Sequence, residues 1–77
     1  MKTREELHES ALALLNLIKE ANKKVYAMMQ YNVEIAEPNG FTPHDDESID
    51  FQKLVVQRLE NSYLKVLHQI IENESIN

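Results

Sequence analysis

Two pairs of side chains have the spacing of metal ligands. Glu5 and His8 stand three residues apart, and His68 and Glu72 stand four apart. On a helix, either spacing places both side chains on one face. If the chain folds back on itself midway, the two pairs lie level, and such ligands can hold zinc. A di-iron site needs Glu-x-x-His on two helices, however, and Lys65 stands where the second glutamate should be. We therefore expect no metal or cofactor, and we keep a metal-binding bundle that uses His8 and His68 as an alternative.

The sequence offers no catalytic signature. Ser, His and Asp all occur, but neither a nucleophile elbow nor a glycine-rich phosphate loop surrounds them. The chain has one glycine and no cysteine, so a phosphate cradle and a catalytic thiol are both ruled out. Two helices also offer little concave space for a substrate. We expect the protein not to be an enzyme.

Acidic side chains gather in the middle of the chain. The net charge is −5, which argues against direct binding of nucleic acid or of an anionic membrane surface, because both need clustered Lys and Arg. No Lys or Arg stands between Lys24 and Lys53. The acids within that interval are Glu34, Glu37, Asp45, Asp46, Glu47 and Asp50.

Helix capping explains only part of this acidic segment. Acids in the first turn of a second helix would account for Asp45, Asp46 and Glu47. Glu34 and Glu37 would instead lie at the negative end of a first helix, where the helix dipole does not favour them. We therefore interpret the segment as a surface that binds a basic site on another protein.

The predicted function is that of a small protein-interaction module. The acidic segment would bind and occlude a basic site on a host protein, with Phe41 and Tyr31 as apolar anchors. In a dimer, two such segments could imitate the phosphate spacing of DNA. Frequent Asn, Lys, Ile and Glu are typical of AT-rich coding sequences, which fits a regulator or inhibitor encoded by a phage or a mobile element. The alternatives are the metal-binding bundle and a purely structural oligomerisation element.

A long amphipathic helix is predicted before the acidic segment. Seam residues recur at alternating intervals of four and three, as in a coiled coil. The series is Leu7, Ala11, Leu14, Ile18, Ala21, Val25, Met28, Asn32 and Ile35. Thr3 can cap this helix, and Pro38 would end it. We interpret Asn32 as the point where the seam turns towards solvent, with Val33 and Ala36 taking over the buried face. The alternative is that Asn32 forms a hydrogen bond inside the bundle that specifies the register or the partner.

A second helix is predicted after a turn. Pro38, Asn39 and Gly40 have the chemistry of a chain reversal, and Phe41 is expected to tuck under it. Either Thr42 or the Asp45–Asp46 pair can begin the second helix. The second seam is Ile49, Val56, Leu59, Tyr63, Val66 and Ile70.

The predicted fold is all-α, an antiparallel two-helix hairpin in a single domain, 1–77. Helix one is expected at 4–36, the turn at 37–43 and helix two at 44–73. Further apolar residues widen both seams, so we expect a homodimer that forms a four-helix bundle. The sequence shows neither a signal peptide nor a membrane span, which predicts a cytoplasmic protein.

Overall fold

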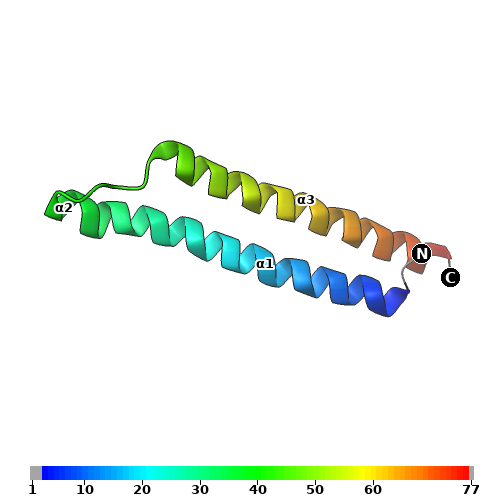
Figure 1. Cartoon of the computed structure of the whole chain (residues 1–77). Helices are drawn as coiled ribbons and strands as arrows, with labels where there is room; N and C mark the ends of the chain where they lie inside the picture. Colours follow the sequence, from blue (N-terminus) through cyan, green and yellow to red (C-terminus); the bar gives the residue numbers. More distant parts are fainter. Residues whose placement is uncertain (1–2, 77) are drawn as a thin grey trace.

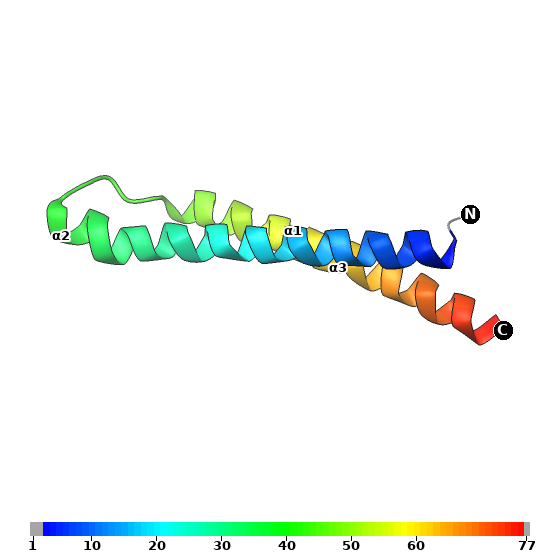
Figure 2. The same ribbon diagram turned by 90° about the horizontal axis from the view of Figure 1, so that it is seen from below.

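Two long helices lie side by side and run in opposite directions. The computed structural model describes residues 3–76 and the side chains of residues 3–74 (Figure 1). Helix α1 spans Arg4–Tyr31 and helix α3 spans Asp46–Ile76, and the start of α1 lies at the same end of the molecule as the end of α3. Figure 2 shows that the helices cross at a shallow angle, as packed helices do. The predicted all-α hairpin is confirmed.

The hairpin is a rod rather than a globule. Its principal extents are 60 × 17 × 16 Å, which leaves room for one layer of side chains between the helices. Within residues 3–76, no helix has the length and apolarity that crossing a bilayer requires.

Helix α1 begins at the predicted cap. The Thr3 hydroxyl accepts the backbone N–H of Glu6 at 3.2 Å and donates to the Glu6 carboxylate at 3.1 Å. At the same end of the rod, Arg4 and Glu74 form an ion pair at 3.0 Å between the two helices. Both side chains are exposed, so the pair stabilises the hairpin by less than about 1 kcal/mol.

The two seams face each other along most of the rod. Leu7, Ala11 and Ile70 form the buried cluster near the chain ends, with Tyr63 and Val66 packed against it. Every other predicted seam residue except Ile35 is also buried or half-buried. These residues are Leu14, Ile18, Ala21, Val25, Met28, Asn32, Ile49, Val56 and Leu59.

A π-helical turn, η1 at Asn32–Ala36, changes the face that is buried after Asn32. The Glu37 N–H donates to the Asn32 carbonyl, five residues back instead of four. This wider turn rotates the following residues, so Ala36 is fully buried while Ile35 is 46% exposed. The predicted transfer of the buried face to Ala36 is confirmed, whereas Val33, which was expected to share it, is 64% exposed.

Helical backbone continues past Pro38. The short helix α2 spans Glu37–Asn39 and follows η1 directly, with Pro38 in its first turn. The helical path thus runs three residues beyond the expected end at 36.

Gly40 reverses the chain. It has φ +70°, the left-handed conformation that ends helices. The Phe41 N–H donates to the Ala36 carbonyl at 2.9 Å, and the Asn39 side chain donates to the Ile35 carbonyl at 2.7 Å. Phe41 itself is 56% exposed. It does not tuck under the turn as expected.

Candidate protein-binding site

The connection, residues 40–45, is fastened to η1 by the side chain of Asn32. The Asn32 amide donates to the His44 carbonyl at 2.9 Å and accepts the His44 N–H at 2.7 Å. Asn32 is half-buried. The buried face does change after Asn32 as interpreted, but the Asn32 side chain forms hydrogen bonds within the chain rather than simply facing solvent. A carboxamide carries one donor and one acceptor group, so it can satisfy both polar groups of a single backbone residue.

Tyr31 supports the same contact. Its ring centroid lies 5.2 Å from that of His44, with the rings tilted by 57°. Because Tyr31 is half-buried, only part of the side chain remains for the predicted role as an apolar anchor. Tyr31 and Asn32 together hold the connection in one conformation.

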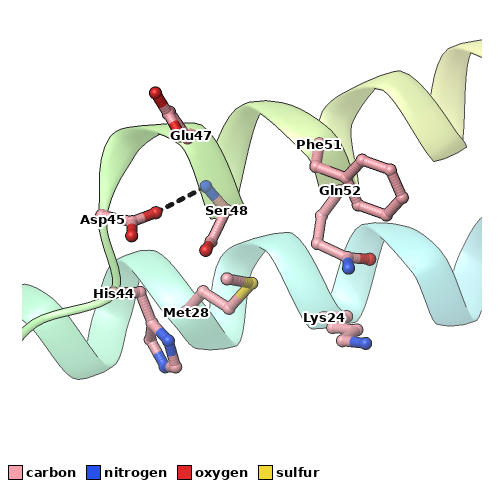
Figure 3. Close-up of a pocket in the computed structure, with 8 residues that line it drawn as sticks. All are labelled: Lys24, Met28, His44, Asp45, Glu47, Ser48, Phe51 and Gln52. Carbon is pink, nitrogen blue, oxygen red and sulfur yellow. Dashed lines mark hydrogen bonds between the residues drawn. The ribbon is translucent and has the colours of Figure 1, made fainter.

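Asp45 begins helix α3, so the later of the two predicted starts is the one that forms. Its carboxylate accepts the Ser48 N–H at 2.7 Å (Figure 3). Its carbonyl accepts the Ile49 N–H at 3.2 Å. Hydrogen bonds from the backbone and the side chain of Ser48 hold the pKa of the Asp45 carboxyl below its ordinary value, and nearby His44 lowers this pKa further. Asp45 is thus occupied as a cap.

The other acids of the segment are exposed at the turn end of the rod. Glu34 accepts a hydrogen bond from Gln30 at 3.2 Å, within the same helical path. None of these acids forms an ion pair among the residues that the structure describes. The exposed acids are Glu34, Glu37, Asp46, Glu47 and Asp50. We call this set the acidic end.

A groove of about 440 Å³ lies beside the acidic end, between α1 and the start of α3. Lys24 and Met28 of α1 line one wall, and Figure 3 shows His44 close to Met28. The other wall is formed by Asp45, Glu47, Ser48, Phe51 and Gln52. Phe51 is exposed and adds an apolar surface that the sequence reasoning missed. The sequence did carry a signal for this surface, because Phe51 is a large apolar residue that does not fall on the seam spacing.

The predicted metal ligands do not assemble. His68 Nε2 lies 3.8 Å from Glu72 Oε1 on the same helix. Within residues 3–74, however, no group of three or more His, Asp or Glu side chains could hold a metal ion. Glu74 is instead paired with Arg4. The convergence of Glu5, His8, His68 and Glu72 is therefore absent from the described structure.

Comparisons of the chain with protein-family models, with curated proteins and with solved structures give no match.

Proposed function

We propose that this protein is a small interaction module whose acidic end binds a basic surface on another protein. The observation that carries the proposal is the exposure of five acids on the helical segments that flank the connection, with no cation paired to them in the described residues. These acids are Glu34, Glu37, Asp46, Glu47 and Asp50. Like charges gathered at one end attract an oppositely charged surface and speed its association.

The connection is ordered before any partner arrives. Four contacts fix the connection between the helices. They are the two Asn32–His44 hydrogen bonds, the hydrogen bond from the Ser48 N–H to Asp45, and the packing of Tyr31 on His44. A surface that is already ordered loses less conformational entropy on binding, so more of the contact energy becomes affinity. Exposed Phe41 and Phe51 supply the aromatic contacts that protein interfaces favour.

The most specific form of this proposal is a regulator or inhibitor. It would act in the cytoplasm, be encoded by a phage or a mobile element, and occlude a basic site, including one that normally binds DNA. Carboxylates at the acidic end would then stand in for phosphates, which basic sites recognise mainly through charge.

We also propose that the protein works as a homodimer. The chain exposes 6127 Å², whereas a compact monomer of 9.0 kDa exposes about 4,900 Å². The surplus of about 1,200 Å² is larger than the roughly 800 Å² that one partner buries in a standard interface. The same surplus favours the second candidate function, a purely structural oligomerisation element.

Partner capture with matched charge variants tests the acidic end. The test variant combines Asp46→Asn, Glu47→Gln and Asp50→Asn, and leaves the Asp45 cap intact. The control combines Glu5→Gln, Glu9→Gln and Glu60→Gln, which removes three negative charges at exposed positions elsewhere. Tagged proteins are used to capture partners from a bacterial lysate, and bound proteins are identified by mass spectrometry.

We expect the wild type and the control to capture the same basic protein, and the test variant to lose it. Capture should also weaken as salt is raised towards 1 M, where the screening length falls to about 3 Å. Equal capture by both variants would reject the acidic end as the binding site. If no variant captures a protein, the structural candidate is favoured.

A further inference from the structure

An apolar patch lies far from the acidic end, at the end of the rod that carries the chain ends. Leu12 and Leu15 belong to α1, and Leu64 and Leu67 belong to α3. Leu12 is 63% exposed and Leu64 is 60% exposed, while Leu67 is half-buried. We call these four leucines the leucine patch.

The four leucines lie on one side of the hairpin. Leu12 and Leu15 follow the seam residue Ala11 by one and four positions, and Leu64 and Leu67 follow Tyr63 by the same intervals. A two-fold rotation relates antiparallel helices, so equal offsets from the seam fall on the same side of the pair. Ala11 and Tyr63 belong to one packed cluster, which places the two pairs at a similar level along the rod.

The groove beside the acidic end confirms this rule on the other side. Lys24 precedes the buried Val25 by one position, and Ser48 precedes the buried Ile49 by one. Both line the same groove, although they belong to different helices. Residues that precede the seam therefore share one side, and the leucine patch faces the opposite way.

We propose that a second copy of this chain covers the leucine patch, with the two rods antiparallel. The inference rests on the proposed homodimer and names its surface. A patch of four leucines is self-complementary across a two-fold axis, as an isologous interface requires. It carries no charge, so it does not suit the basic partner proposed for the acidic end. The surplus exposed area supplies enough surface for such an interface.

Charge sets the orientation. The segment between Lys24 and Lys53 holds only negative charges. Parallel rods would place two such ends side by side, within about two interhelical distances, or roughly 20 Å. Antiparallel rods place them at opposite poles of an assembly built from rods 60 Å long. That separation is several screening lengths at physiological salt, where one length is about 8 Å.

Sedimentation of matched leucine variants tests the surface. The test variant combines Leu12→Gln and Leu64→Gln. The control combines Leu17→Gln and Leu54→Gln, which makes the same change once in each helix, outside the patch; Leu17 is 53% exposed. We expect the wild type and the control to sediment as dimers, and dimerisation of the test variant to weaken by about a hundredfold or more.

A conservative variant guards against simple misfolding. Combining Leu12→Met and Leu64→Met keeps apolar side chains of similar volume, so this protein should retain the dimer and the helical circular dichroism signal. Equal weakening of the test and control variants would overturn the assignment of the surface. A monomeric wild type would overturn the dimer as well, yet partner capture by the acidic end could still succeed, so the two failures are distinguishable.

Spin-label distances test the orientation. The chain has no cysteine, so Thr42→Cys introduces a single labelling site in the connection. Antiparallel rods should give a distance between the two labels near or beyond the 60 Å length of one rod. A distance of about 20 Å would show parallel rods and overturn the proposed orientation.

Discussion

At the scale of single residues, Asn32 is the polar member of the first seam and holds the connection in place. It satisfies both backbone groups of His44 and so joins η1 to the connection. We expect Asn32→Ala to lower the free energy of unfolding by about 1–3 kcal/mol, because two polar groups lose their partners. Urea unfolding measures this change. Asn16→Ala, at an exposed position of α1, should shift stability by no more than about 0.5 kcal/mol. Equal effects of the two substitutions would show that the hydrogen bonds between Asn32 and His44 contribute nothing to stability.

Asp45 gives the hairpin a defined response to acid. Its pKa is held below the ordinary value of 3.8 by the Ser48 hydrogen bonds. A carboxyl with a lowered folded pKa stabilises the fold above its unfolded pKa, and this contribution is lost as pH falls through the folded value. We expect a carbon NMR titration of the Asp45 carboxyl to give a midpoint below 3.8.

The variant Asp45→Asn separates this effect from general acid unfolding. Asparagine can still cap α3 but does not titrate between pH 5 and pH 2. Its stability should therefore fall less than that of the wild type over that interval. An identical fall in both proteins would contradict a role for Asp45.

At the scale of elements, the helices follow from periodicity and the turn does not. The seam from Leu7 to Asn32 and its counterpart from Ile49 to Ile70 were predictable, because a hydrophobic repeat of four and three fixes the buried face. The π-turn depends on a carbonyl pairing five residues away, which leaves no periodic signal. It is why Ala36 replaces Ile35 in the core.

The site was predictable in part for the same reason. The position of the acids follows from the charge pattern, so their gathering at one end required only that the chain reverse near Gly40. The roles of Asn32 and Tyr31 depend on where His44 lies, and the preceding connection has no repeat to fix it. Phe51 was missed because it lies off the seam.

Gly40 allows an element-scale test of the turn. A Cβ at this position would meet no heavy atom within 4 Å, so a substitution there tests backbone strain alone. We expect Gly40→Ala to lower the unfolding free energy by about 1–2 kcal/mol, the cost of a left-handed backbone for an L-residue. Thermal and urea unfolding provide the measurement. Gly40→Asn should cost less, because asparagine tolerates this conformation; equal costs would point away from backbone strain.

At the scale of the whole molecule, shape divides the proposed roles. The acidic end lies at the connection, and the leucine patch lies towards the chain ends of a rod 60 Å long. Self-association through the leucines would therefore leave the acidic end of each copy open. An antiparallel dimer would present two such ends at opposite poles, which would allow one dimer to bind two partner molecules.

Thermal unfolding of the unmodified chain reports whether this assembly forms. Few side chains are fully buried within one hairpin, so most of its stability should come from the second copy. A hundredfold rise in protein concentration then increases the apparent free energy of unfolding of the dimer by about 2.7 kcal/mol. For two chains of this length that corresponds to an increase in Tm of about 5–10 °C. A Tm that stays constant over the same range would mean that the hairpin folds alone, and that its exposed leucines face water.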